Sequence, residues 1–237
     1  MKRLDKILSD AGVAGRRELK DMIRLGRVTV DGVAVKKADA KFDETAVTIA
    51  VDGEEICLEK FVYYMLHKPA DVVTATEDGE HKTVLDLFPA ELRRRGLFPV
   101  GRLDKDTTGL LIITNDGDYA HRIISPKTHV AKRYYAETDG IPTEEDANAF
   151  LEGMVLRDGT QCLPAKLEVT GECNCYVTLL EGKYHQVKRM LAARGKPVVK
   201  LHRCSVGLLE LDNALKAGEF RPMTAEEVEN SLVKLPL

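Results

Sequence analysis

Long apolar runs are absent from this sequence of 237 residues. A membrane-spanning helix needs roughly 18 or more consecutive apolar residues, and no stretch approaches that length, so we expect no membrane association. Residues Met1–Lys6 are basic but no apolar run follows them, and we therefore expect no signal peptide and a cytoplasmic location. Hydrophobic residues make up 44% of the chain and charged residues 31%, which is typical of a soluble globular protein.

Cysteine is sparse, and its spacing matches no zinc motif. The five cysteines, an odd number, stand at positions 57, 162, 173, 175 and 204. In a strand, Cys173 and Cys175 would point to one face, but no second pair or histidine is near them in sequence. We therefore expect no metal site and interpret the cysteines as small buried residues in a reducing compartment. No glycine-rich phosphate loop is present, so no nucleotide cofactor is expected.

An excess of one charge is also lacking, because 35 Lys and Arg are opposed by 38 Asp and Glu, for a net charge of −3. This balance alone gives no indication of a nucleic-acid partner. The distribution of charge along the chain does give such an indication. Residues 1–37 carry a net charge of +5, residues 38–60 carry −5 and residues 181–203 carry +6. Local basic segments, rather than the charge of the whole chain, govern phosphate binding. The alternative at this point is that these segments are merely solvated surfaces.

The N-terminal segment is expected to form a small domain of helices and short strands. Leu4, Ile7 and Leu8 recur at helical spacing, and glycines at 12 and 26 are placed to end two helices. Asp31-Gly32 predicts a type I′ hairpin turn, because both residues tolerate the positive φ that this turn requires. The expected elements are helices over 4–11 and 16–25 and strands over 28–30, 33–35 and 47–51.

Residues 2–48 resemble the alpha-L RNA-binding module of a ribosomal small-subunit protein, tyrosyl-tRNA synthetases and many RNA-modifying enzymes. The resemblance rests on the two helices, the Gly26-Arg27-Val28 step and the Asp31-Gly32 turn. It implies a basic helix face that holds structured RNA through shape and phosphate contacts. The implied contact residues are Arg3, Arg16, Arg17, Lys20, Arg24 and Arg27. We expect this RNA-binding domain to span residues 1–58 and a second domain to span residues 59–237, with a hinge at Glu59-Lys60.

Beyond the hinge, short β-rich segments alternate irregularly with a few helices. Because the order lacks the regular alternation of a parallel βαβ array, we predict an α+β fold. In it, the small helical and β-hairpin domain precedes a larger mixed, mainly antiparallel sheet with flanking helices. Capping-box patterns at Thr143 and Thr224 begin two of the helices. Expected strands cover 61–66, 109–114, 133–138, 163–170, 176–181, 198–202 and 208–211, and expected helices cover 118–124, 144–152, 185–194 and 225–232.

The densest group of reactive side chains lies in residues 99–117, where a polar turn carrying Asp104 and Asp106 leads into an apolar strand. Several interpretations compete. An aspartyl-phosphate motif directly follows a buried strand, whereas Gly101-Arg102 precede the aspartate motif of this chain. An aspartic protease needs Asp-Thr-Gly and a second copy of it. A glycosidase acid and base are possible, yet we expect the side chains of Asp104 and Asp106 to point to opposite sides. A purely structural turn is the remaining alternative.

Three motifs occur in order along the second domain: Gly101-Arg102-Leu103-Asp104, Lys132-Arg133-Tyr134 and the segment Glu181–Met190. With the N-terminal module, they resemble the RNA pseudouridine synthases, in the family that modifies ribosomal RNA. The strings D-T-T-G-L, Y-H-Q-V-K-R-M and V-V-x-L-H-R are most similar to members that act on small-subunit (16S) ribosomal RNA. The resemblance implies the pseudouridine synthase fold and site-specific isomerisation of uridine to pseudouridine, without metal or cofactor. The alternatives are a large-subunit (23S) enzyme of the same family and a non-catalytic RNA-binding factor for ribosome assembly.

The resemblance also implies roles for individual residues. Asp104 matches the catalytic carboxylate, and Lys188 matches its paired cation. Tyr134 matches the tyrosine that stacks on the target uracil, and Arg102 matches the arginine that fills the space left by the extruded nucleotide. Without the resemblance, Lys188 would be a phosphate contact and Tyr134 a core strand residue. Further candidates for contacts with the RNA backbone are Lys183, Arg189, Arg194, Lys196 and Arg203.

One residue departs from the family pattern. Asp71, in the segment His67–Asp71, stands where the family commonly has a glycine, which leaves the conformation of this loop open. The partner that the resemblance implies is ribosomal RNA, within a small-subunit assembly intermediate. We expect the protein to act as a monomer.

Overall fold

Two compact units make up the chain in the computed structural model, which describes residues 1–56, 58 and 60–237. The first unit comprises Met1–Val62 and Phe88–Leu97, and the second comprises Tyr63–Leu87 and Phe98–Leu237. Cys57 and Glu59 lie outside the described residues, and Glu59 is part of the predicted hinge. Within the described ranges, no helix is both long enough and apolar enough to cross a membrane.

The N-terminal unit combines helices and short strands as the sequence predicts. Its hairpin turn has the predicted geometry, because Asp31 and Gly32 adopt φ angles of 49° and 78°. Gly12 and Gly26 follow the two main helices with φ angles of 79° and 75°, in the left-handed conformation that commonly ends helices. The elements are β1 (Lys2–Arg3), α1 (Leu4–Asp10), α2 (Arg16–Arg24), β2 (Val28–Val30), β3 (Val33–Ala34), β4 (Lys41–Phe42), β5 (Ile49–Val51), β6 (Glu54–Glu55) and α3 (Ala90–Arg93).

One face of each main helix builds the core of this unit. Leu4, Leu8, Leu19 and Ile23 are buried together with the apolar residues of β2 and β5. Four strands form a sheet in the order β3-β2-β5-β6, and β1 pairs separately with β4. The opposite face of α2 is exposed and basic. The two-residue strands β1, β4 and β6 are not predicted from the sequence, because their pairing partners rather than local patterns define them.

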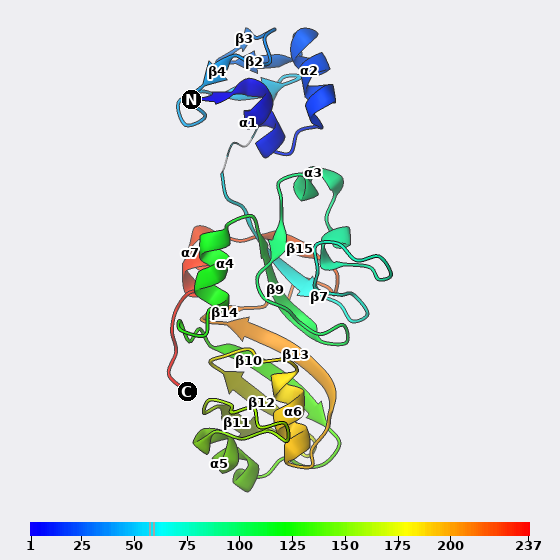
Figure 1. Cartoon of the computed structure of the whole chain (residues 1–237), viewed down its shortest axis with the longest axis vertical. Helices are drawn as coiled ribbons and strands as arrows, with labels where there is room; N and C mark the ends of the chain where they lie inside the picture. Colours follow the sequence, from blue (N-terminus) through cyan, green and yellow to red (C-terminus); the bar gives the residue numbers. More distant parts are fainter. Residues whose placement is uncertain (57, 59) are drawn as a thin grey trace. The chain divides into compact units, whose positions relative to one another are not determined.

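A single mixed sheet is the framework of the C-terminal unit (Figure 1). Its strand order is β11-β12-β10-β13-β9-β7-β15, with β14 paired to β13 and β8 paired to β9. Among the described strands, β9 and β13 pair in parallel and the other pairings are antiparallel. The predicted α+β class with a mainly antiparallel sheet is thus confirmed.

The bounds of the elements in this unit agree closely with the prediction. The strands are β7 (Tyr63–Lys68), β8 (Phe98–Pro99), β9 (Thr108–Thr114), β10 (Lys132–Thr138), β11 (Lys166–Val169), β12 (Asn174–Leu179), β13 (Val198–Val206), β14 (Leu209–Glu210) and β15 (Phe220–Pro222). The helices are the 3-10 turn η1 (Val84–Leu87), α4 (Gly117–Ile124), α5 (Glu144–Glu152), α6 (Gln186–Ala193) and α7 (Ala225–Asn230). Both predicted capping boxes are formed.

Several differences from the prediction have a local cause. Strand β11 starts later than predicted because Leu163 N–H donates to the Glu181 carboxylate at 2.9 Å instead of joining the sheet. Strand β13 continues beyond His202 because its pairing with β10 extends to Val206. The expectation that the cysteines are buried is wrong for Cys173, which is exposed before β12 begins. The short elements β8, β15 and η1 were not predicted.

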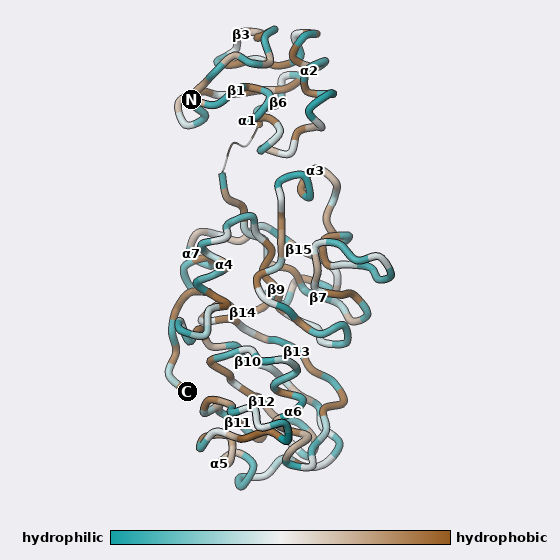
Figure 2. The backbone as a smooth tube through the Cα atoms, in the orientation of Figure 1, coloured by the Kyte–Doolittle hydropathy of each residue, from teal (hydrophilic) through white to brown (hydrophobic). Residues whose placement is uncertain are grey.

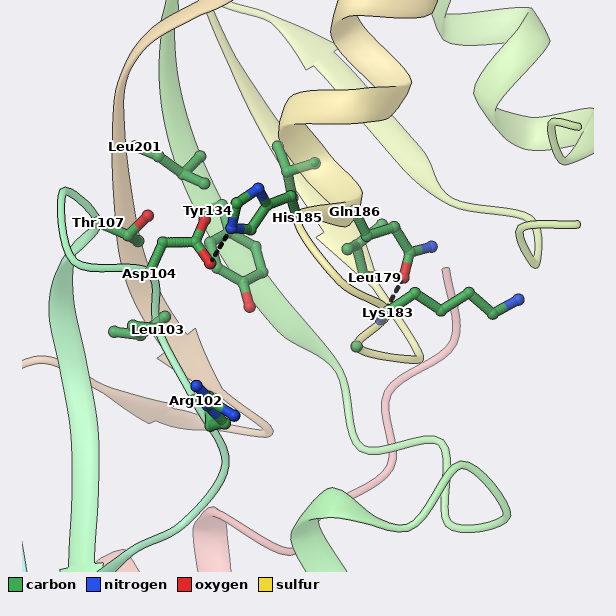
Figure 3. A pocket seen from close by; sticks show the side chains of 12 residues that line it. Arg102, Leu103, Asp104, Thr107, Tyr134, Leu179, Lys183, His185, Gln186 and Leu201 are labelled. Atoms are coloured by element: carbon green, nitrogen blue, oxygen red, sulfur yellow. Dashed lines mark hydrogen bonds and ion pairs between the residues drawn. The ribbon is translucent and has the colours of Figure 1, made fainter. Parts of the chain in front are cut away.

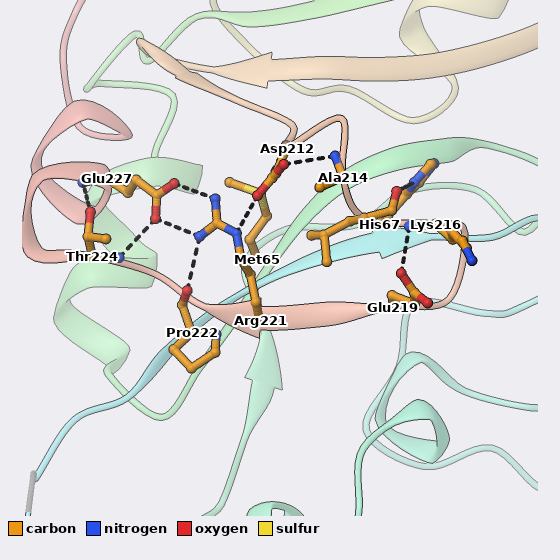
Figure 4. Close-up of polar contacts among 11 residues, drawn as sticks. Met65, His67, Asp212, Ala214, Lys216, Glu219, Arg221, Pro222, Thr224 and Glu227 are labelled. Atoms are coloured by element: carbon orange, nitrogen blue, oxygen red, sulfur yellow. Dashed lines mark hydrogen bonds and ion pairs between the residues drawn. The ribbon is translucent and has the colours of Figure 1, made fainter.

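Arg221 ties the C-terminal segment to the edge of the sheet (Figure 4). It lies on β15, which pairs with β7, and its Nε donates to Asp212 Oδ2 at 2.6 Å. Its terminal nitrogens donate to the two carboxylate oxygens of Glu227 at 2.6 and 2.8 Å. These hydrogen bonds lower the pKa of Glu227. They also tie α7 to β15, and Tyr119 Oη of α4 lies 2.7 Å from Ser231 Oγ, which follows α7.

Strand β9 lies near the middle of the sheet and is buried from Gly109 to Thr114. Its chain is coloured at the hydrophobic end of the scale in Figure 2. At its start, Gly109 has a φ of 106° and pairs with Arg203 of β13. A Cβ at residue 109 would lie 2.3 Å from the Arg203 carbonyl oxygen and 2.6 Å from its amide nitrogen. Only glycine fits this close approach.

We predict that Gly109→Ala destabilises the protein by at least about 2 kcal/mol, because the new methyl group forces apart the β9–β13 pair and the φ angle is strained. Denaturant unfolding followed by circular dichroism measures this loss. Gly117→Ala is the matched control, since no atom lies within 4 Å of a Cβ there. Equal stability of the two variants would contradict this account of the parallel pair.

Candidate active site

The turn that carries Asp104 joins β8 to β9 and is fixed by several hydrogen bonds. Thr107 N–H donates to the Asp104 carbonyl at 3.1 Å. The buried Thr74 hydroxyl donates to the Leu103 carbonyl at 2.7 Å and accepts from Leu103 N–H at 3.2 Å. Asp71 N–H donates to the Lys105 carbonyl at 2.9 Å. The turn is therefore held from both sides of Asp104.

The backbone conformation of Asp71 explains how this residue can replace the glycine that is common in the family. Its φ is 64°, so the position requires the left-handed conformation that glycine adopts without strain. Aspartate tolerates this conformation better than most other residues. The loop conformation is thus compatible with either residue.

Lys68 is a fully buried lysine beneath this turn, with 0% of its surface exposed. It ends strand β7, and its Nζ donates to three carbonyl oxygens, those of Pro69 at 2.9 Å, Lys105 at 3.2 Å and Thr107 at 2.9 Å. Burial lowers the pKa of Lys68 to about 8, although the negative charges of Asp106 and Asp104 oppose the shift. The ammonium group thus links the end of β7 to the residues on either side of Asp106.

A second turn brings the start of α6 to the same place. The buried Glu181 carboxylate accepts from Gln186 Nε2 at 2.7 Å, and Gln186 Oε1 accepts from Lys183 N–H at 2.9 Å. His185, at the N-terminal boundary of α6, has a φ of 47°. This left-handed residue directs its imidazole toward the Asp104 turn (Figure 3).

Asp104 and Lys188 form the ion pair that the family resemblance implies. Lys188 Nζ lies 2.9 Å from Asp104 Oδ2 and 2.6 Å from Asp106 Oδ1. The other Asp104 oxygen lies 3.2 Å from His185 Nε2. Burial alone would lower the pKa of Lys188, but its hydrogen bonds to Asp106 and Asp104 raise it. The hydrogen bond from Lys188 in turn lowers the pKa of Asp106.

One expectation about this pair of aspartates is wrong. The two side chains do not diverge, because Asp104 and Asp106 both contact Lys188. Strand alternation gave no ground for that expectation, since residues two apart on an extended strand share one face. Residues 104–107 form a turn, closed by the hydrogen bond from Thr107 N–H to the Asp104 carbonyl, and β9 begins only at Thr108. Asp106 is therefore a second counter-charge for Lys188.

Asp104 borders a cleft that also receives the ring of Tyr134 (Figure 3). The cleft encloses about 420 Å³, including open solvent at its mouth, and apolar side chains such as Leu179 and Leu201 complete its wall. Thr107, which is only 1% exposed, lines the cleft with a buried hydroxyl that has no partner among the described residues. The cleft thus combines a carboxylate, an aromatic ring and an unused hydrogen-bonding group.

Arg102 lies on the same strand connection two residues before Asp104, and it is exposed at the border of the cleft. Figure 3 shows its side chain apart from the Asp104 carboxylate. It is therefore placed beside the cleft entrance rather than within the ion-paired group.

The predicted RNA contacts fall into two groups. Arg16, Arg17 and Lys20 are exposed on α2, where residues spaced by three and four share a face. Lys196 is half-buried and has no acidic partner among the described residues, whereas the others are engaged by acidic residues or buried. Arg3 pairs with Asp5, Arg24 with Asp21, Arg27 with Asp52, Lys183 with Glu181, Arg189 with Asp158 and Arg194 with Asp146. Arg203 is buried and lines a cavity rather than the protein surface.

Sequence reasoning missed His185, Lys68 and Thr107 as parts of the site. His185 stands three residues before Lys188 in a quoted motif, and that proximity was a usable signal. Lys68 and Thr107 also lie in quoted segments, His67–Asp71 and D-T-T-G-L, but their roles arise from carbonyl groups and burial that only the fold creates. Among the described residues, no cluster of three or more His, Cys, Asp or Glu side chains is placed to hold a metal ion.

Comparisons with known proteins agree with this arrangement. Residues 62–193 match the family model of RNA pseudouridylate synthases, and residues 2–47 match the S4 domain. A ribosomal small subunit pseudouridine synthase A of Vibrio cholerae is 45% identical over 228 residues, covering 95% of this chain and 97% of its own. An uncharacterized RNA pseudouridine synthase of Bacillus subtilis is 42% identical, covering 95% of this chain and 96% of its own.

A solved structure extends the similarity to the fold. A crystal structure of a pseudouridylate synthase matches with a TM-score of 0.69 and 38% identity, covering 97% of this chain and 99% of the other. The family match and the similar structure together make this chain an RNA-modifying enzyme. The chain belongs to the RNA pseudouridylate synthase family, and its N-terminal unit contains an S4 domain.

We predict that Lys68→Met lowers the rate of pseudouridine formation at least about 10-fold, because misplacing a reactive group by an ångström has a large cost. The variant leaves three buried carbonyls without their donor and releases the Asp104 turn. Single-turnover kinetics measure the effect. Lys105→Met, which removes an exposed lysine from the same turn, should keep the wild-type rate, and an unimpaired Lys68→Met enzyme would contradict the positioning role.

Proposed function

We propose that this enzyme converts one uridine of small-subunit (16S) ribosomal RNA to pseudouridine, with Asp104 as the catalytic carboxylate. The observation that carries the proposal is the Asp104 carboxylate, held between Lys188 and His185 at the border of the Tyr134 cleft. The 45% identity with a small-subunit enzyme of Vibrio cholerae over nearly the full length supports the choice of RNA. Such a substrate places the protein in the cytoplasm of a bacterium, in contact with an assembling small subunit.

The reaction breaks the C1′–N1 bond of uridine, turns the uracil and forms a C1′–C5 bond. The C5 proton is lost and N1 gains a proton, so no atom is added overall and no oxidant is consumed. The chemistry needs an ionised carboxylate next to the sugar and base, and Asp104 supplies it. Lys188 and His185 on its two oxygens fix the orientation of this group, because each contacts a different oxygen.

The cleft must also hold a uracil that has lost its bond to the sugar. The Tyr134 ring provides a stacking surface, and such stacking is worth roughly 1–3 kcal/mol per base. Arg102, exposed at the cleft entrance, is placed to fill the space that the extruded nucleotide leaves. Extrusion costs a few kcal/mol, which contacts of this kind offset.

Asp104→Asn should lower pseudouridine formation at least about 1,000-fold, because the amide is neither nucleophilic nor basic. A tritium-release assay on a 16S ribosomal RNA transcript measures the rate. Asp106→Asn is the matched control, since it also contacts Lys188 but is exposed at the surface; it should lose much less. Near wild-type turnover by Asp104→Asn would show that the catalytic group is assigned wrongly.

Pseudouridine mapping in cells that lack the protein identifies the substrate. The proposal requires the loss of one pseudouridine from 16S ribosomal RNA. Loss from 23S ribosomal RNA would make the protein a large-subunit enzyme instead. If no pseudouridine were lost, and the protein bound precursor subunits without releasing tritium, it would be a non-catalytic assembly factor.

The exposed basic face of α2 is proposed to bind the RNA backbone. We predict that Arg16→Gln combined with Arg17→Gln weakens ribosomal RNA binding and reduces the slope of log affinity against log salt by about 1–2, because each lost phosphate contact contributes about 0.9 or less to the slope. Fluorescence anisotropy across a salt titration measures both quantities. Lys216→Gln, an exposed lysine of the catalytic unit, is the control, and an unchanged slope in the double variant would refute the phosphate role.

A further inference from the structure

A second cavity lies next to the Tyr134 cleft and contains two buried cations. It encloses about 520 Å³, including open solvent, and its walls combine apolar residues such as Val100, Ile112 and Ile123 with Lys132 and Arg203. Arg102, Tyr134 and Gly182 line both this cavity and the cleft. The two spaces are therefore neighbours that share a wall.

Lys132 and Arg203 come from adjacent strands and face the same side as Tyr134. Lys132 and Tyr134 are two residues apart on β10, where burial alternates with every residue, so their side chains share one face. Arg203 of β13 stands opposite Tyr134 in the antiparallel register. Only 8% of Lys132 and 4% of Arg203 is exposed.

Neither cation forms an ion pair with a carboxylate among the described residues. Lys132 Nζ donates to the carbonyls of Ile123 at 3.1 Å and Val130 at 2.8 Å. Arg203 Nε donates to the Leu110 carbonyl at 2.8 Å. Burial lowers the pKa of Lys132 to about 8, and the positive charge of Arg203 adds to this shift. Buried charges are normally paired, so this cavity has an excess of positive charge.

The two side chains retain unused donors for a ligand. An ammonium group has three N–H donors and a guanidinium has five. Two of the three Lys132 donors are used by carbonyls, and the Arg203 interactions of the described residues involve Nε alone. The terminal nitrogens of Arg203 and one Lys132 donor therefore remain for an acceptor in the cavity. Carboxylates and phosphates match such a set of donors.

We propose that this cavity binds a backbone phosphate of the RNA next to the uridine whose base enters the Tyr134 cleft. This inference rests on the proposed function, because the substrate is the anion that would occupy a space sharing Arg102 and Tyr134 with the cleft. The phosphate neutralises the paired cations, and the apolar walls strengthen the interaction by excluding water. It thereby sets which nucleotide of a bound strand is aligned with Asp104.

A purely structural explanation accounts for only part of these observations. Lys132 does bind the Ile123 carbonyl near the end of α4, and cations commonly satisfy such carbonyls. This role does not require a second cation beside it. Nor does it explain why both cations line a cavity rather than solid core. The variants below separate the two roles.

The test uses the full-length protein and an oligonucleotide carrying the mapped uridine. Each phosphate flanking that uridine is replaced in turn by an uncharged methylphosphonate, and affinity is measured by anisotropy. The wild type should lose about 10-fold in affinity at one of these linkages. Lys132→Met and Arg203→Gln should bind the natural RNA about 10-fold more weakly than the wild type does. Replacing the same linkage by methylphosphonate should weaken the binding of these variants by less than a further 2-fold. The slope of log affinity against log salt should fall by about 1 in each variant.

Two variants on the same strands are matched controls. Lys200→Met on β13 and Arg133→Gln on β10 alter cations that pair with Glu137 and Glu168 and lie outside the cavity. They should keep the full wild-type sensitivity to the methylphosphonate. Circular dichroism establishes that each variant is folded. If folded Lys132→Met and Arg203→Gln proteins remained as sensitive as the wild type, the proposal would be overturned.

If the variants fail to fold, the affinity of the wild type for the methylphosphonate RNAs still tests the proposal. Insensitivity to an uncharged linkage at every flanking position would refute the proposal. Thermal unfolding in sulfate against chloride provides an RNA-free measurement, in which Lys132→Met or Arg203→Gln, where folded, shows the general stabilisation by sulfate. A larger rise in Tm for the wild type than for these variants, combined with no effect of any methylphosphonate, would assign the cavity to a free anion and overturn the RNA role. These readouts measure binding, so an absence of pseudouridine formation would refute the proposed function separately.

Discussion

The geometry of the site depends on one buried ammonium group. Lys68 reaches three backbone carbonyls from the end of β7, two of them in the turn that carries Asp104. Three carbonyl dipoles and the nearby negative charges of Asp106 and Asp104 oppose the cost of burying this charge, although they do not cancel it, since the pKa of Lys68 still falls to about 8. A neutral side chain would fill the space but could not join the turn to the sheet. The position of the carboxylate is thus set by the sheet beneath it.

The cations at the site and at the neighbouring cavity differ in whether a carboxylate of the same chain neutralises them. Lys188 is satisfied within the chain, because two carboxylates contact its ammonium group. Lys132 and Arg203 have only carbonyl acceptors, and they border a cavity. Thr107 keeps a buried hydroxyl without a partner beside the cleft. Buried groups left unsatisfied are costly in a folded protein, and here they collect where the substrate is proposed to bind.

The sequence predicted those features that depend on local patterns. Asp31-Gly32, the two capping boxes and the apolar run of β9 each specify their structure within a few residues, and the ordered motifs paired Asp104 with Lys188. The prediction that Asp104 and Asp106 diverge was wrong, because residues two apart share a face even on an extended chain, and the turn at 104–107 directs both side chains to Lys188. Basic residues such as Arg189 were predicted from charge alone, but charge patterns do not reveal that Asp158, distant in sequence, pairs with it. Partners distant in sequence, such as Asp52 for Arg27 and Asp146 for Arg194, account for several of these differences.

The net charge of −3 now has a physical interpretation. Several basic side chains are paired within the chain, whereas others, including Arg16, Arg17 and Lys20 on the exposed face of α2, have no acidic partner among the described residues. A uniformly basic protein binds any phosphate backbone, whereas separate cationic sites favour RNA whose phosphates match their positions. Selectivity for one folded RNA is therefore compatible with a slightly acidic chain. It follows from where the unpaired cations lie rather than from how many there are.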